Sequence, residues 1–170
     1  PVVKAEIIKG KVNFSQNRFF ASSISAKKAK VKTKWEIPII FKKNKVNFGE
    51  TGFFRTAYSK ELLERLREPI QHKKLSACDR LGVIRDLFAL SEAGTIPTTD
   101  VLEFLSSYKK ENNYTVWLGL ATGLAQLEQI LAKTPNKEGL KKIILNLFSP
   151  LATKLGWEKR KNEIHTDALL

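Results

Sequence analysis

His72, His165 and Cys78 are the residues of this chain best suited to metal binding or nucleophilic catalysis. A catalytic zinc needs about three close nitrogen, sulfur or oxygen ligands and an open position. The two histidines form no H-x-x-x-H pair, and Cys78 has no Cys or His at ligand spacing. Cys78 falls in the first turn of a predicted helix, where the dipole can activate a thiol. We interpret it instead as a small buried residue beside the helix start. The sequence therefore predicts no catalytic residue, no cofactor-binding residue and no metal ligand in this chain.

Two charged pairs, Asp79-Arg80 and Arg85-Asp86, could in principle carry acid–base chemistry. Neighbours in sequence do not face each other on a helix, which argues against a shared proton. We interpret Asp79 as the acidic residue of a helix start, and Arg85 and Asp86 as surface or interhelix pairing.

The loop Gly49-Glu50-Thr51-Gly52, followed by Arg55, resembles a phosphate or nucleic-acid clamp. A G-x-x-G clamp of the nucleic-acid type lies between helices, whereas strand-like segments flank this loop. We therefore predict a turn in the last hairpin of a strand domain, with Arg55 tethering that domain to the helices that follow. The chain also has no P-loop, dinucleotide-binding fingerprint or G-x-S-x-G elbow.

The net charge of +13 is concentrated in the first part of the chain. Residues 1–60 hold 14 Lys+Arg against 3 Asp+Glu (+11), and residues 61–170 hold 16 against 14 (+2). A basic segment attracts polyanions. The lysines of Lys27–Lys34 lack the interleaved aromatic residues of a base-stacking surface, which favours a solvated face.

The composition also bounds the setting of the chain. No apolar run approaches the ~20 residues of a membrane span, so we expect no membrane partner. The single Cys78 fits a reducing compartment, for which we expect the cytoplasm. The chain begins in a strand-like segment and stops at a helix-start pattern, His165–Leu170, so we expect a segment of a longer protein.

The hydrophobic period changes near residue 59, which predicts an α+β chain. Before it, short strands are expected at Val2–Ile8, Lys11–Phe20, Val31–Phe41, Val46–Phe48 and Phe53–Tyr58, with Pro38 making the third an edge or bulged strand. This pattern is typical of a small antiparallel β-sandwich.

After it, helices are expected to begin at Ser59, Ser76, Thr98 or Thr99, Asn113 and Asn136. Pro69 should limit the first helix, Gly94 should end the second, and Pro150 should kink or interrupt the fifth. Short loops predict antiparallel neighbours in a bundle or superhelix. The expected domains are 1–58 (sandwich) and 59–170 (first helices of a second domain).

Five stretches, in this order, resemble one enzyme family: Trp35–Ile40, Asn47–Tyr58, Leu75–Gly94, Leu155–Trp157 and His165–Leu170. They are similar to the W-x-I-P strand, the N-x-x-x-x-G-aromatic-aromatic-R-V-x-Y segment, with Thr56 where the family usually has Val, and the S-x-x-D-R helix of zinc-dependent aminopeptidases. These are the M1 enzymes, the aminopeptidase N and puromycin-sensitive aminopeptidase group. The resemblance covers residues 35–170 well and 1–34 loosely.

The resemblance implies the β-sandwich domain and the opening helices of the helical domain that covers the active site in this family. The family's G-A/G-M-E-N and H-E-x-x-H motifs are not in this chain, so zinc and catalysis are expected in another domain of the parent enzyme. The first hypothesis is therefore a non-catalytic spacer or hinge and wall of a peptidase. Its partners would be the catalytic domain and the remaining helices of the same polypeptide, with peptide substrate bound through the parent and some self-association of the separate chain. The alternative is an independent basic adapter that binds a polyanion or a protein partner.

Overall fold

The computed structural model describes residues 1–22, 24–25, 33–156 and 158, and the statements below concern these residues. Short strands come first: β1 (Val2–Ile8), β2 (Lys11–Asn17), β3 (Phe41–Lys42), β4 (Lys45–Val46) and β5 (Arg55–Tyr58). Helices follow: α2 (Lys60–Gln71), α3 (Ala77–Glu92), α4 (Thr98–Phe104), the 3-10 helix η1 (Leu105–Tyr108), α5 (Tyr114–Leu131) and α6 (Lys137–Leu155). This order confirms the predicted α+β class.

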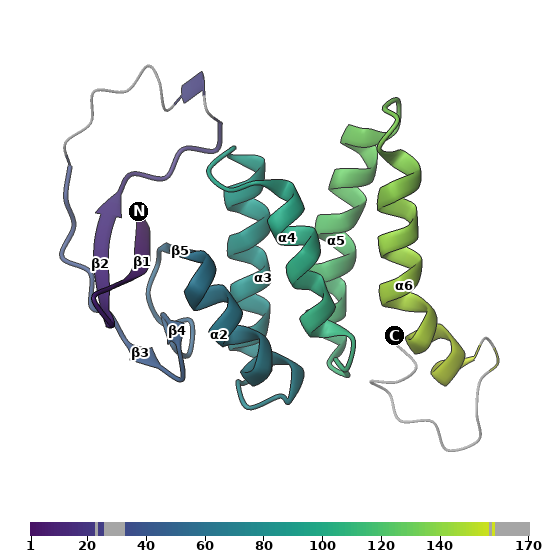
Figure 1. Ribbon diagram of the computed structural model, residues 1–170, viewed down its shortest axis with the longest axis horizontal. Helices are drawn as coiled ribbons and strands as arrows, with labels where there is room; N and C mark the ends of the chain where they lie inside the picture. The colour runs from purple at the N-terminus through teal and green to yellow at the C-terminus, as the bar shows by residue number, and fades with distance from the viewer. Residues whose placement is uncertain (23, 26–32, 157, 159–170) are drawn as a thin grey trace.

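The elements are laid out side by side along an elongated molecule (Figure 1), with the strands at one end and α6 at the other. α3 packs against β5 on one side and α5 on the other, and η1 contacts both α2 and α6. α2 also contacts β1 and β5, so α2 and α3 together lie between the strands and the later helices.

The three-stranded sheet has the order β2-β1-β5. β1 and β2 pair antiparallel through a tight turn at Lys9 and Gly10, both with positive φ. β1 and β5 pair in parallel, so the prediction of a wholly antiparallel set is wrong for this pair. The physical reason is the long connection between residues 17 and 55, which lets the chain return to the same end of β1.

β4 and β5 lie in different sheets, so the predicted last hairpin does not exist. β4 instead pairs antiparallel with β3, through a turn at Lys43 and Asn44, both with positive φ. The polar turn expected at residues 42–45 is thus present, although Lys42 and Lys45 are strand residues.

Residues 33–40, expected as a strand, form no strand in the structure. Their exposure still alternates, with Trp35, Ile37 and Ile39 half-buried and the residues between them exposed. Pro38 cannot donate to a ladder. In place of a neighbouring strand, the Gln16 side chain donates to the Trp35 carbonyl (2.8 Å) and accepts from the Trp35 N–H (2.8 Å).

Three of the predicted helix starts carry a side-chain cap. The Ser59 hydroxyl accepts from the Leu62 N–H, Ser76 from the Asp79 N–H and Asn113 from the Thr115 and Val116 N–H groups. Such caps satisfy backbone donors that have no partner within the helix. Gly94 follows α3 with a φ of +68°, as expected for a left-handed helix end.

Other helix predictions need correction. Pro97, not a threonine, is the N-cap of α4. The Thr98 hydroxyl is instead hydrogen-bonded to the Ser91 hydroxyl of α3 (2.8 Å). Asn136 occupies the N-cap of α6 without a side-chain bond. α2 continues past Pro69 to Gln71. α6 ends at Leu155 as predicted and continues through Pro150, so Pro150 does not interrupt it, and a kink there stays a prediction.

One hydrophobic core joins strands and helices, from Val3 of β1 through Leu87 of α3 to Leu147 of α6. The division at residue 58 stays a prediction, and the helix start expected at His165–Leu170 lies outside the described residues. Within the described part of the chain, no helix is long and apolar enough to cross a membrane.

Candidate functional site

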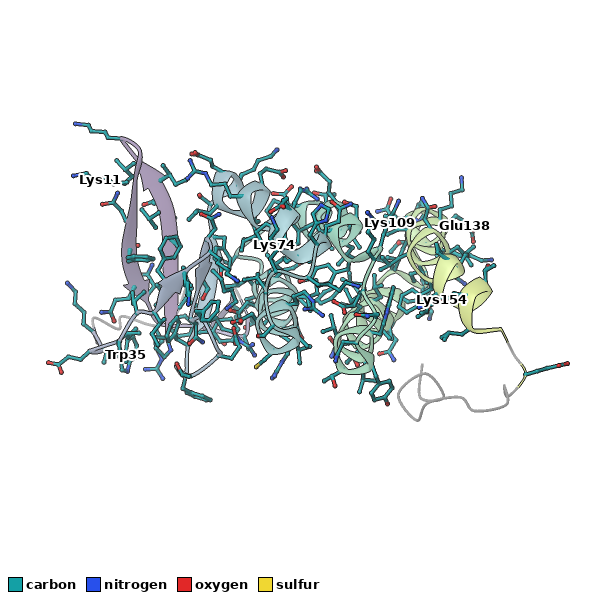
Figure 2. All side chains as sticks on the ribbon, turned by 90° about the horizontal axis from the view of Figure 1, so that it is seen from below. Lys11, Trp35, Lys74, Lys109, Glu138 and Lys154 are labelled. Carbon is teal, nitrogen blue, oxygen red and sulfur yellow. The ribbon has the colours of Figure 1, made fainter. Side chains whose placement is uncertain are left out.

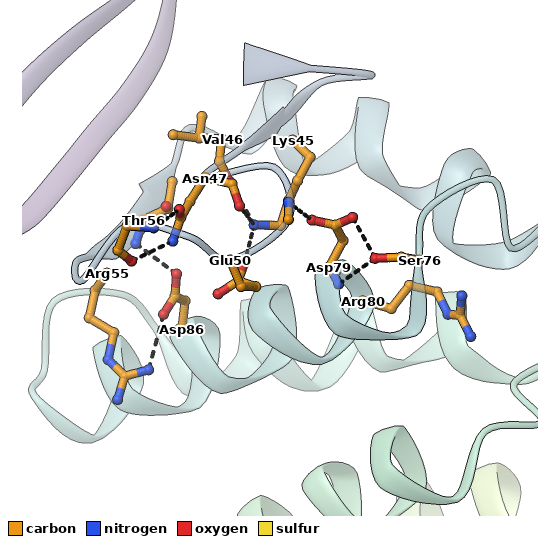
Figure 3. Close-up of polar contacts among 12 residues, drawn as sticks. Lys45, Val46, Asn47, Glu50, Arg55, Thr56, Ser76, Asp79, Arg80 and Asp86 are labelled. Carbon is orange, nitrogen blue, oxygen red and sulfur yellow. Dashed lines mark hydrogen bonds and ion pairs between the residues drawn. The ribbon is translucent and has the colours of Figure 1, made fainter. Parts of the chain in front are cut away.

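Several buried or half-buried polar residues lie where the strands meet α3. We call the set Lys45, Asn47, Glu50, Arg55, Tyr58, Asp79 and Asp86 the junction network; Figure 3 labels all of its members except Tyr58. Its members come from β4, β5, the loop between them and α3.

Asn47 closes the loop that the sequence marks with two glycines. Its side-chain oxygen accepts from the Gly52 N–H (2.7 Å), and its amide donates to the Gly52 carbonyl (2.9 Å). Asn47 itself has a φ of +56°, a conformation that asparagine tolerates better than most residues. The loop is a turn, as predicted, and an asparagine side chain stabilises it. Its glycine amides are therefore not arranged as a phosphate cradle: Gly52 N–H is bonded to Asn47, and Gly49 N–H is bonded to Asp79 (2.6 Å).

Lys45 is completely buried, which is rare for lysine and requires polar partners. Its ammonium donates to the carbonyls of Val46 (2.6 Å) and Asn47 (3.3 Å) and forms an ion pair with Glu50. All three donors of the ammonium thus have an acceptor. Lys45 holds the loop from inside, so it adds nothing to the surface charge.

Glu50 and Asp79 fix the loop onto α3. The Glu50 carboxylate lies over Gly82, where an added Cβ would come within 2.1 Å of it. Asp79 accepts from the Gly49 N–H and from the Ser76 hydroxyl (2.6 Å). Asp79 is the helix-start acid that the sequence predicts, and it also bonds the loop.

Asp86 pins β5 to α3. It accepts from the Thr56 N–H (2.8 Å) and from Nη1 of Arg55 (3.1 Å). Burial raises the pKa of Asp86 to about 6, although the Thr56 N–H and the Arg55 guanidinium both favour the charged form. The structure thus confirms the predicted contact of Arg55 with the helices.

Tyr58 links the two sheets. Its hydroxyl accepts from the Val46 N–H (3.1 Å) and donates to the Val46 carbonyl (3.2 Å). Burial raises the pKa of Tyr58 well above its usual value, so the phenol stays neutral and can do both. The Thr56 hydroxyl is a buried polar side-chain atom with no hydrogen-bond partner within the described residues.

A further ion pair, between Arg80 and Glu111, is buried at both partners and holds the helices together. Arg80 of α3 donates from Nε and Nη2 to the two Glu111 oxygens (2.6 and 2.7 Å), and from Nη1 to the Leu75 carbonyl (2.7 Å). Burial alone would raise the pKa of Glu111, but bonds from Arg80 and from the Asn112 and Asn113 N–H groups hold it below its usual range. The pair fixes the connection between η1 and α5 against the start of α3.

These carboxylates and cations are occupied by one another, so the network is built for holding elements together and leaves no open acid–base pair. Within the described ranges, no group of three His, Cys, Asp or Glu side chains could hold a metal ion. His72 is the exposed C-cap of α2, and His165 lies outside the described residues. Cys78 is exposed, so our interpretation of it as a buried residue is wrong. It lies in the first turn of α3, on the side of the helix that faces solvent.

Sequence reasoning missed Lys45, Glu50, Glu111 and the closing role of Asn47. A lysine in a lysine-rich turn carries no sign of burial, because its partners are backbone carbonyls and a residue five positions away. The sequence predicts surface or interhelix pairing for both Arg85 and Asp86. In the structure Asp86 is buried and pairs with Arg55, whereas Arg85 is exposed. The sequence shows the spacing of Asn47 and Gly52, and the structure gives its physical reason: the Asn47 side chain bonds both backbone groups of Gly52.

The fold and the junction define a class of protein rather than a catalytic centre: a strand segment fastened to the start of a stacked helical domain. The chain belongs to the ERAP1-like C-terminal domain family, whose model matches residues 44–170. It corresponds to a C-terminal part of an M1 aminopeptidase.

Several curated relatives support this assignment. The chain is 40% identical over 128 residues, 74% of its length, to "Aminopeptidase M1-A" of Oryza sativa subsp. japonica. It is 30% identical over 122 residues, 70% of its length, to "Puromycin-sensitive aminopeptidase" of Caenorhabditis elegans. A 27% identical alignment to "Aminopeptidase 2" of Candida albicans covers the whole chain. The chain spans 15%, 13% and 21% of these relatives, respectively.

Proposed function

We propose that this chain is a non-catalytic part of a zinc-dependent aminopeptidase that removes N-terminal residues from peptides. Within it, the junction network acts as the hinge or spacer between a strand domain and a helical wall over the active site. The observation that supports this role most directly is Asp86, a buried carboxylate of α3 that bonds both the backbone and the side chain of β5. The zinc would be bound by the larger part of the enzyme, outside the aligned segment.

The catalytic part of this proposal is tested on the purified chain with a chromogenic aminoacyl anilide and added zinc. We expect no turnover, because no group of three His, Cys, Asp or Glu side chains within the described residues could hold a zinc ion. Chelator-sensitive hydrolysis by the pure chain would overturn the assignment of catalysis to another part of the enzyme.

The hinge and wall are tested in the full-length enzyme with Asp86→Asn. If the wall limits access, loosening the junction should change the kcat/KM for a long peptide several-fold relative to that for a small anilide. Arg65→Ala on the exposed face of α2 is the matched control, since among the described residues Arg65 pairs only with exposed Glu61. An unchanged ratio for Asp86→Asn would remove the wall from the proposal.

The alternative adapter function finds less support in the contacts. In residues 1–60, Lys45 is buried, Lys4 pairs with Glu6 and Arg55 pairs with Asp86. The labelled lysines are spread along the length of the molecule, from Lys11 at the strand end to Lys154 near the α6 end (Figure 2). Heparin binding that persists above ~0.2 M salt would favour the adapter, and binding lost by then is non-specific attraction.

Self-association of the separate chain remains part of the proposal. Leu118 and Ile130 of α5 and Leu145 of α6 are 49%, 65% and 54% exposed. Exposed apolar side chains on outer helices promote association. Sedimentation velocity over a concentration series tests this, and a constant monomer would contradict it.

A further inference from the structure

A groove of about 400 Å³ runs along the seam between α3 and α5, and we call it the α3–α5 groove. Gly119 and Gly123 of α5 let the helices approach closely. A Cβ at Gly119 would lie 2.5 Å from Leu81 Cδ1, and one at Gly123 would lie 2.3 Å from the Phe88 ring. Gly119 meets Leu81 and Gly123 meets Phe88, so the two helices run in the same direction along the groove.

Two guanidinium groups line the groove. Arg55 reaches it from β5 and Arg85 from α3. Arg55 uses Nη1 for Asp86, and its side chain is 35% exposed, so its other N–H groups face the groove or solvent. Arg85 is exposed, and no carboxylate of the described residues forms an ion pair with it. Arginine pairs of this kind suit a carboxylate, which accepts two N–H bonds in one plane.

Glu92 and the Gln126 amide are the last residues of α3 and α5 that line the groove, so they lie at one end of it. Glu92 lies seven residues beyond Arg85 on α3, which is about 10 Å along a helix. An extended chain covers that distance with about three residues. Phe88 lies between Arg85 and Glu92 along α3 and offers an apolar wall there, whereas Leu81 and Leu118 line the groove on the other side of Arg85.

We propose that the α3–α5 groove binds an extended peptide segment of another chain with an acidic side chain at one end and a basic one about three residues away. The carboxylate lies between Arg55 and Arg85, and the basic group lies at Glu92. The charge order of the groove selects this occupant over a uniformly acidic or apolar segment. The inference rests on the groove alone and does not depend on the proposed enzyme.

The test is an NMR titration of the ¹⁵N-labelled chain with acetyl-Asp-Ala-Ala-Lys-amide. The amides of Gly119 and Gly123 should shift, and the neutral peptide acetyl-Asn-Ala-Ala-Gln-amide should leave them in place. Arg85→Ala should weaken binding about tenfold or more, because a charge-assisted pair is lost. Arg85 is exposed, so this variant should keep its melting temperature.

Arg65→Ala, an exposed arginine of α2, is the matched control and should bind within about twofold of the unmodified chain, since it lies outside the groove. Equal shifts with the neutral peptide would overturn the proposal. So would an Arg85→Ala variant that binds as well as the unmodified chain, or an Arg65→Ala variant that loses as much affinity.

Discussion

At the scale of residues, the buried charged residues Lys45, Asp79 and Asp86 lie in the contact between β4, the loop before β5, β5 and α3. Asp86 and Lys45 are both buried, and each is bonded to backbone as well as to an opposite charge. Removing one partner of a buried ion pair destabilises the fold by more than the intact pair stabilises it, because the remaining charge is left buried without a partner. Single substitutions here should therefore act through the partner that remains.

Arg55→Ala should lower the melting temperature. The change removes the cationic partner of Asp86, whose side chain is only 5% exposed. A loss of about 1–3 kcal/mol corresponds to a few degrees for a chain of this size. The drop, measured by circular dichroism, should be larger at pH 8, where Asp86 is charged, than at pH 5. A drop no larger than that of Arg65→Ala would contradict the tether.

Asp86 should make the free energy of unfolding depend on pH. Its pKa is about 6 in the folded chain and 3.8 as the ordinary value, so the folded state binds the proton more tightly. The associated stability is fully present below pH 3.8 and is lost as the pH rises through about 6. A shift of about 2 units is worth at most about 3 kcal/mol. Urea denaturation between pH 4 and 7.5 should show this slope, and Asp86→Asn should remove it; equal slopes would refute the assignment.

Thr56→Val should stabilise the chain. The Thr56 hydroxyl is buried without a hydrogen-bond partner within the described residues, which costs about 1 kcal/mol or more. Valine has nearly the same shape and no polar atom, and it is the residue that the related motif usually has here. Thermal melts should show a gain of a few degrees. A lower melting temperature would indicate that the hydroxyl has a partner.

At the scale of elements, glycines decide how closely α3 meets its neighbours. Gly82 lets the Glu50 loop lie on one face of α3, while Gly119 and Gly123 let α5 approach another. Serine and asparagine caps define where the helices begin, but the glycines define how far α3 lies from the Glu50 loop and from α5. The G-x-x-x-G spacing of Gly119 and Gly123 places both on one helix face.

Gly123→Ala should destabilise the chain, although alanine is the better helix former. Its Cβ would lie 2.3 Å from the Phe88 ring, so the ring must shift or α3 and α5 must move apart. Overpacking of this kind costs about 1–3 kcal/mol. Gly139→Ala in α6 is the matched control, because its Cβ meets nothing within 4 Å. Urea midpoints should fall for the first variant and stay or rise for the second; the opposite order would contradict close packing.

At the scale of the whole molecule, strands and helices share a core and a polar junction. Val3 of β1, Leu62 of α2 and Leu87 of α3 belong to one cluster of buried side chains. Because that cluster extends to Leu147 of α6, neither part has a hydrophobic core closed off from the other.

Hydrogen exchange should therefore find one cooperative unit. Amides of β1 (Val2–Ile8) and α3 (Ala77–Glu92) should open with free energies within about 1 kcal/mol of each other, since losing either removes core from both. Mass spectrometry of the exchanged peptides measures this. Independent opening of β1 at much lower free energy would instead support the predicted division at residue 58.

The sequence by itself determined the α+β class, the starts of α2, α3 and α5, the left-handed end of α3 and the family, because caps, periodicity and motif spacing act over a few residues. Only the tertiary structure decided that β5 pairs in parallel with β1, that residues 33–40 form no strand, and that Lys45 is buried. Each of these depends on partners distant in sequence or on backbone atoms that no side-chain pattern reveals. The contact of Arg55 with Asp86 depends on both the sequence and the tertiary structure. The sequence motifs contain both residues, and the fold places Arg55 Nη1 3.1 Å from Asp86 Oδ1.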